Sequence, residues 1–259
     1  MMACVAIMGL SVLLWTMFGY SLSFGGNHAG IIGDFRWAFL NDVGWEAGPY
    51  ADTIPHLVFA AFQMMFAMIT PALITGAVVG RMRFKALFAF IALWSFLVYY
   101  PMAHMVWGEG GFLAAIGSVD FAGGNVVHIS SGVSALVLAT YLGRRKGYEK
   151  TSYRIHNIPF VVLGASLLWF GWFGFNAGSA LAADGLAAHA FMTSAISSAA
   201  AGRADCRGAA VAAKGNGVAE PACKRDFCGA AEYFSGGIFC HSGIWEQHFC
   251  KPAPGAGGG

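Results

Sequence analysis

Residues 121–142 form an uninterrupted stretch without Asp, Glu, Lys or Arg, preceded by Asp120 and containing His128. A helix of this length and polarity is long enough to cross a bilayer. An ionisable residue inside such a helix is costly and usually faces a protein interior, a cavity or a substrate path. Asp120 and His128 are eight residues apart, so a continuous helix places them about two turns apart on one face. We therefore expect function to depend on this pair.

The composition extends the membrane prediction to most of the chain. Its 259 residues are 57% hydrophobic and 11% charged, whereas a soluble domain carries about 25% charged residues. The predicted fold class is all-α, a polytopic transmembrane helical bundle. The composition supports neither soluble catalysis nor nucleic-acid binding, so we do not expect an enzyme. Six spanning segments are predicted, the last of them short: 3–24, 54–80, 86–107, 121–142, 157–181 and 186–201.

The loops between these segments alternate in charge. Loop 81–85 carries three basic residues and loop 143–154 carries five, whereas loops 25–53 and 108–119 are acidic. Lys and Arg are enriched in the cytoplasmic loops of membrane proteins. The sequence therefore predicts that loops 81–85 and 143–154 are cytoplasmic and that the two acidic loops lie outside.

The chain changes character near residue 201, which divides it into a membrane region, 1–201, and a Cys/Gly-rich tail, 202–259. Three interpretations of the tail stay open. Its cysteines and histidines offer soft ligands for a small zinc domain, although their spacing lacks the usual rhythm of ligand pairs. It is alternatively a disulfide-linked extracellular segment. The third interpretation is a frameshifted or disordered tail, favoured by the abrupt end of the apolar run.

Several residues in the spans suit a cation site. Trp107 is predicted at the outer membrane interface, where it serves either as an aromatic anchor or as a cation–π wall. Asp120 suits the N-terminal end of a helix, because its carboxylate can accept hydrogen bonds from the free N–H groups there. Trp172, Phe175 and Ser179 share one stripe of a helix. The Ser179 hydroxyl is placed to accept a hydrogen bond from a substrate.

Three motifs together resemble the ammonium transporter (Amt/Mep/Rh) family. They are Asp120–Gly124 with Val126–His128, Ala103–Gly108, and Gly171–Ser179, and Gly19–Gly25 fits that family's second transmembrane helix. The resemblance covers about residues 5–201. It implies an eleven-helix fold, built from two inverted halves, in a homotrimer with one pore per subunit. The chain then corresponds to about half of that fold and is expected to lack the first helix and the second half.

The same resemblance implies roles for individual residues. Phe66 and Phe175 would be a stacked pair that gates the outer vestibule. Trp107 and Ser179 would form the outer ammonium site, which Asp120 shapes. His128 would be the first of two pore histidines, and Trp172 is assigned to the pore with it. The second pore histidine of the family has no match in this chain.

The implied function is membrane transport of ammonium or ammonia, without a cofactor or a metal. Ammonium would be recruited outside and deprotonated, since a bare charge is expensive to carry through an apolar pore. Expected partners are the substrate, the lipid bilayer, further copies of the chain and a cytoplasmic nitrogen-regulatory protein, in the plasma membrane. Alternatives are an ammonium sensor or transceptor, a non-functional fragment, and an unrelated membrane protein with His104 and His128 as metal ligands.

Overall fold

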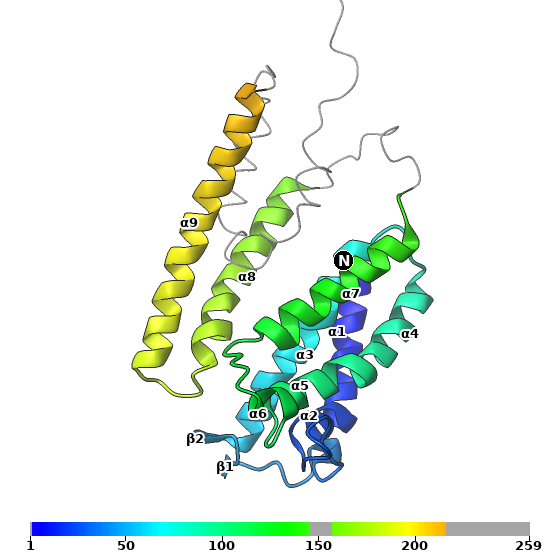
Figure 1. Cartoon of the computed structure of the whole chain (residues 1–259), viewed down its shortest axis with the longest axis vertical. Helices are drawn as coiled ribbons and strands as arrows, with labels where there is room; N and C mark the ends of the chain where they lie inside the picture. Colours follow the sequence, from blue (N-terminus) through cyan, green and yellow to red (C-terminus); the bar gives the residue numbers. More distant parts are fainter. Residues whose placement is uncertain (1, 146–156, 216–259) are drawn as a thin grey trace, which may run out of the picture. The chain divides into compact units, whose positions relative to one another are not determined.

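The computed structural model describes residues 2–145 and 157–215, which fall into two separate units, Met1–Tyr148 and Glu149–Gly259 (Figure 1). The first unit begins with a continuous helical segment and alternates long helices with short connections. Its elements are α1 (Met2–Leu14), η1 (Trp15–Gly19), α2 (Tyr20–Phe24), η2 (Ala38–Leu40), β1 (Ala47–Gly48), β2 (Ala51–Pro55), α3 (His56–Val78), α4 (Phe84–Trp94), η3 (Ser95–Tyr99), α5 (Tyr100–Trp107), α6 (Phe112–Ala115), η4 (Gly124–Ile129) and α7 (Ser130–Leu142).

The predicted transmembrane helical bundle is confirmed. Within the described residues, five segments are long and apolar enough to cross a membrane. They match the first five predicted spans, and α3 packs lengthwise against both α1 and α7 in the first unit (Figure 1). The five segments are Met2–Phe24, His56–Val78, Phe84–Ala115, Gly124–Leu142 and Pro159–Gly178.

The sixth predicted span is wrong in two respects. Segment 186–201 belongs to α9 (Gly185–Gly215), which is not among the five apolar spans of the described chain. The helix also continues past residue 201, because the Ala-rich sequence that follows has high helix propensity and lacks proline. The domain boundary at 201 stays a prediction, and most of the tail lies outside the described residues.

Three of the spans contain a π-helical turn, namely η1, η3 and η4. Such turns are rare and occur frequently at functional sites. The first span approaches the third at Gly19, the last residue of η1, where a Cβ atom would lie 2.6 Å from Cε1 of Tyr100. Only glycine allows the helices to come this close at that position.

Hydrogen bonds tie the basic loops to each other at one end of the first unit. The Arg81 side chain donates to the carbonyls of Ala77 and Ala139, and also to that of Gly143 at 2.5 Å. Loop 81–85 and the start of loop 143–154 therefore lie together, an arrangement compatible with the prediction that both face the same side of the membrane. Residues 146–156 of the second loop lie outside the described part of the chain.

The two acidic loops meet at the opposite end. The Asn27 amide donates to the carbonyl of Gly110 at 3.0 Å, and the Phe112 N–H donates to the carbonyl of Gly30 at 2.8 Å. The Tyr50 hydroxyl accepts from the Glu109 N–H at 3.1 Å. This end is formed by contacts between segments that are far apart in the sequence.

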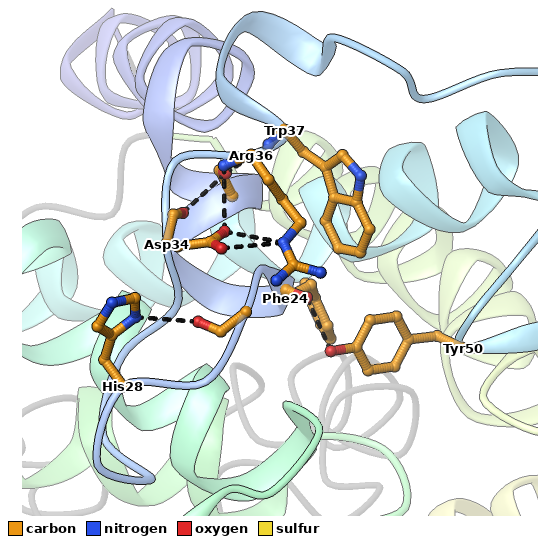
Figure 2. Close-up of polar contacts among 8 residues, drawn as sticks. Phe24, His28, Asp34, Arg36, Trp37 and Tyr50 are labelled. Atoms are coloured by element: carbon orange, nitrogen blue, oxygen red, sulfur yellow. Dashed lines mark hydrogen bonds and ion pairs between the residues drawn. The ribbon is translucent and has the colours of Figure 1, made fainter.

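Loop 25–53 is folded back onto the helices (Figure 2). Tyr50, between the strands of the β1–β2 hairpin, donates from its hydroxyl to the carbonyl of Phe24 at 2.8 Å, and Arg36 pairs with Asp34 at 2.9 Å. Burial alone would raise the pKa of the Asp34 carboxyl, but hydrogen bonds from Arg36 outweigh it and lower that pKa. Burial raises the pKa of the Tyr50 hydroxyl. The apolar runs gave no indication of this hairpin.

Among residues 157–215, the second unit contains α8 (Ile158–Gly178) and α9, which pack against each other. The Asn157 side chain accepts a hydrogen bond from the Phe160 N–H and so caps the start of α8. Phe173 stacks on Phe191 of α9 with ring centroids 4.3 Å apart. This ring contact joins the two helices.

Candidate functional site

The Asp120 carboxylate organises the start of the fourth spanning segment, η4–α7. Its Oδ1 accepts from the N–H groups of Gly123 at 2.6 Å and Gly124 at 2.7 Å. Its Oδ2 accepts from the N–H groups of Asn125 at 2.8 Å and Val126 at 3.1 Å. The predicted role of Asp120 as a helix cap is confirmed. A carboxylate there also suits the positive end of the helix dipole.

The structure corrects the relation between Asp120 and His128. The helix begins at Gly124 and not at residue 121, because Gly123 has a left-handed φ of 93° and the chain turns there. Asp120 therefore precedes the helix and folds its side chain over the first N–H groups. The two residues are not two turns apart on one helix face.

Trp107 is fixed to the same turn. Its indole N–H donates to the Asp120 carbonyl at 2.8 Å, so the backbone and the side chain of Asp120 have separate tasks. Phe66 lies against the indole, with ring centroids 5.5 Å apart and planes at 83°. Phe66 is buried, whereas Trp107 is partly exposed. The N–H edge of Trp107 is thus occupied, and its ring is held at one position.

Phe66 also lies next to the Asp120 turn. A Cβ atom on Gly123 would lie 3.4 Å from Cδ1 of Phe66, and the ring of Phe62 packs on Phe66 at 5.0 Å. The structure therefore brings together three of the predicted site residues: Phe66, Trp107 and Asp120. We refer to these three residues as the outer corner.

His128 lies within the π-helical segment η4, where its N–H donates to the Gly123 carbonyl at 3.1 Å. Its side chain is partly exposed. The Ser131 hydroxyl donates to the His128 carbonyl at 3.3 Å. The turn that Asp120 caps therefore also sets the direction of His128.

The other predicted site residues belong to the second unit. Trp172 stacks on Phe175 with ring centroids 4.5 Å apart and planes at 19°. Ser179 lies just beyond the end of α8, and its hydroxyl donates to the Phe175 carbonyl at 2.9 Å. The Ser179 oxygen keeps lone pairs with which to accept. The predicted pairs Phe66–Phe175 and Trp107–Ser179 each combine one residue of the first unit with one of the second. Both pairs therefore stay predictions.

Sequence reasoning missed a polar cluster behind Trp107. His104 is fully buried, with Nδ1 at 3.1 Å from the Ser23 carbonyl and Nε2 at 3.3 Å from Oδ1 of Asn27. The same Asn27 oxygen accepts from the Gly30 N–H at 2.6 Å. His104 is therefore a packing residue that holds the last turn before Trp107. The hydrogen-bond partners of His104 are distant in the sequence, so its residue type was the only feature that could have indicated a polar contact.

The site residues do not fit a metal. No group of three or more His, Cys, Asp or Glu side chains with suitable spacing occurs among residues 2–145 and 157–215. Both ring nitrogens of His104 already face oxygen atoms. The Cys and His residues of the tail beyond Gly215 lie outside the described residues.

Comparison with known proteins finds relatives over most of the chain. Residues 1–212 match the model of the Ammonium Transporter Family. An ammonium transporter of Bacillus subtilis is 54% identical over 180 residues, which are 70% of this chain and 44% of that protein. Ammonium transporter Amt1 of Archaeoglobus fulgidus is 48% identical over 193 residues, 74% of this chain and 47% of that protein. The chain thus spans about half the length of the curated relatives it matches.

Solved structures agree with this. The crystal structure of Saccharomyces cerevisiae Mep2 matches with a TM-score of 0.76 and 32% identity, covering 88% of this chain and 52% of that one. A structure titled "Sensor Amt Protein" matches with a TM-score of 0.68 and 32% identity, covering 76% of this chain and 50% of that one. The fold predicted from the apolar runs is therefore shared with these proteins.

Proposed function

The chain belongs to the Ammonium Transporter Family, and we propose that it takes part in the transport of ammonium or ammonia across the plasma membrane. It is a multi-pass membrane protein and not an enzyme. In this proposal the acidic-loop end faces outside and the Arg81 end faces the cytoplasm, as the charge pattern predicts. A homotrimer and a cytoplasmic nitrogen-regulatory partner belong to the same proposal.

The observation that carries the proposal is the outer corner. Trp107 is held by its N–H on the Asp120 carbonyl and by its contact with Phe66, at the end of the bundle that bears the acidic loops. Because the indole N–H is already hydrogen-bonded, a ligand would meet the face of the indole ring. The face of a Trp ring is the best aromatic partner for a cation. A fixed ring requires no rearrangement when ammonium arrives.

The chemistry of the substrate explains the rest of the arrangement. Ammonium and K⁺ are similar in size, so selection requires hydrogen-bond acceptors as well as aromatic rings. The Ser179 oxygen is such an acceptor, and Phe66 and Phe175 are proposed to gate the path inward. A bare charge in an apolar pore is expensive. We therefore propose that ammonium loses its proton near the outer corner and that His128, with Trp172, lines the path of ammonia.

Uptake of methylammonium tests the proposed function. The whole chain, reconstituted in phospholipid vesicles, is expected to take up labelled methylammonium. Excess ammonium should suppress that uptake, and the same concentration of K⁺ should not. Vesicles without protein provide the background. Uptake that K⁺ suppresses as strongly as ammonium would contradict an ammonium-selective path, and so would a rate no higher than the background.

A sensor is the second candidate, because a protein titled "Sensor Amt Protein" shares the fold. A sensor would bind ammonium without net flux. In the uptake experiment it would change its intrinsic tryptophan fluorescence on addition of ammonium while uptake stayed at background. A fluorescence change without uptake would favour sensing over transport as the function of the chain.

His128 provides a test inside the path. His128→Ala removes a side chain that can donate at one ring nitrogen and accept at the other. We expect the rate of methylammonium uptake, or its selectivity over K⁺, to change by about tenfold, equivalent to about 1.4 kcal/mol. His28→Ala is the matched control, because His28 lies on the surface of loop 25–53. Equal rates and selectivity in both variants would contradict the assignment of His128.

A further inference from the structure

An exposed group of phenylalanine rings lies beside the first span. Phe35 and Phe39, in the loop after α2, are 64% and 63% exposed. Both contact Phe18 of η1, with ring centroids 6.4 Å and 5.6 Å apart. Phe18 in turn contacts Phe96 of η3 at 6.2 Å. We call these four residues the aromatic shoulder; the transport proposal assigns none of them a role.

The position of Phe18 sets the depth of the shoulder. Phe18 precedes the end of α2 at Phe24 by six residues, which corresponds to about 9 Å along a helix. Because Phe35 and Phe39 reach Phe18, their rings lie alongside the spanning segment and not above its end. Loop 25–53 therefore folds back toward the membrane at these two residues.

The shoulder is continuous with the lateral face of the bundle. Leu93 and Leu97 flank Phe96 in the third span and are 63% and 74% exposed. Leucines exposed on the side of a spanning segment are suited to contact with hydrocarbon. The rings of Phe35 and Phe39 extend that apolar face outward to the loop.

A charged side chain, that of Arg36, lies beside the aromatic shoulder. Arg36 separates Phe35 from Trp37 in the sequence, pairs through Nε with Asp34, and lies 5.8 Å over the Trp37 ring (Figure 2). Its side chain is 55% exposed. The core of a protein–protein interface is depleted of charged residues, whereas the border of a bilayer places apolar rings below and a cation beside the phosphates.

The backbone at one end of the shoulder is unusual. Phe39 and Leu40 have φ values of 57° and 56°, a left-handed conformation that residues other than glycine seldom adopt. In a soluble protein, an exposed Phe39 on this unfavourable backbone would have little to offset its cost. Contact with acyl chains would offset this cost, because it removes the apolar ring from water.

We propose that the aromatic shoulder is a lipid contact: Phe35 and Phe39 insert between phospholipids at the boundary of acyl chains and headgroups, with Arg36 at the level of the phosphates. The occupant is the phospholipid of the leaflet at the acidic-loop end. The contact anchors loop 25–53, and with it Asn27 and Trp37, against the bilayer.

Photo-crosslinking tests this contact directly. Phe39→p-benzoylphenylalanine and, separately, Phe35→p-benzoylphenylalanine are introduced into the whole chain, reconstituted in vesicles of phosphatidylcholine and phosphatidylglycerol. After illumination, mass spectrometry should find phospholipid adducts at both positions. Asp52→p-benzoylphenylalanine is the control, because Asp52 is exposed on β2 ahead of the α3 span and is expected to face water.

The outcomes separate the possible occupants. Lipid adducts at positions 35 and 39 with few or none at 52 support the proposal. Crosslinks from position 39 to a second copy of the chain would overturn it in favour of a subunit interface. Lipid adducts of equal yield at all three positions, or none at 35 and 39, would also overturn it. Two independent labelling positions keep the test decisive if one variant fails to fold.

Discussion

One residue, Asp120, makes two kinds of contact at the end of the helices that bears the acidic loops. The side chain of Asp120 accepts hydrogen bonds from four backbone N–H groups. Its backbone carbonyl accepts a fifth from the indole N–H of Trp107. Donors in the first turn of a helix lack intrahelical partners, so an acid there is favourable both as an acceptor and as a charge. The position of Trp107 is consequently linked to the start of the helix that carries His128.

Asp120→Asn should therefore weaken the fold at this turn. The amide has one acceptor oxygen, and its NH₂ group would face N–H groups that the carboxylate now accepts. We expect a loss of about 1–3 kcal/mol in unfolding free energy, measured as a lower thermal midpoint in detergent. Asp52→Asn, on the exposed face of β2, is the control and should leave the midpoint unchanged. Equal midpoints for the two variants would contradict the capping role.

At the level of helices, close approach rather than sequence periodicity sets the packing of the first and third spans. Gly19 ends the π-helical turn η1, and the buried ring of Tyr100 occupies the space where a side chain would extend. Tyr100 also contacts Trp15 and Phe96, so its ring has little room to move. The π turns thus mark the place where two helices meet.

Gly19→Ala should be destabilising although alanine is the better helix former. The added methyl group meets Tyr100, and overpacking of this kind costs about 1–3 kcal/mol. Gly9→Ala in the same helical segment is the matched control, since nothing lies within 4 Å of the added atom. It should gain up to about 1 kcal/mol from helix propensity. Thermal unfolding of both variants checks this, and a Gly19→Ala midpoint at or above that of Gly9→Ala would contradict the packing account.

Over the first unit as a whole, two sets of hydrogen bonds hold the loops at opposite ends. Arg81 joins the end of α3 to the last turn of α7, where carbonyls lack partners and a cation is favoured. At the other end, Asn27 and Tyr50 join the acidic loops. Both ends therefore depend on contacts between distant parts of the chain.

Arg81→Met removes the bonds at the basic end while keeping an unbranched side chain. We expect a loss of about 1.5–3 kcal/mol in unfolding free energy, the usual worth of hydrogen bonds to a charged group. Arg83→Met is the control, because Arg83 is exposed two residues further along. The measurement is thermal unfolding in detergent. A midpoint that falls equally in both variants would show that general loop charge, and not the Arg81 contacts, is responsible.

The spans and the Asp120 cap were predictable because both depend on local sequence. An apolar run needs only its own length to define a span, and an acid ahead of a helix needs only the next few N–H groups. The Asn27–His104 cluster and the contact of Gly19 with Tyr100 were not predictable, since each depends on partners far away in the sequence. The β1–β2 hairpin is local, but its two short strands carry no alternation of apolar and polar residues that would have indicated it. The predicted end of the last helix at 201 failed because a fall in hydrophobicity is not a helix stop signal.

The central claim is that Trp107 recruits ammonium at the outer corner, and the half-saturation concentration for methylammonium uptake tests it most directly. Trp107→Leu removes a cation–π contact worth about 0.5–2 kcal/mol. The half-saturation concentration should therefore rise by about 2- to 30-fold. Trp45→Leu is the control, because Trp45 is 78% exposed ahead of β1 and should leave the value unchanged. Equal half-saturation concentrations for wild type, Trp107→Leu and Trp45→Leu would contradict the account.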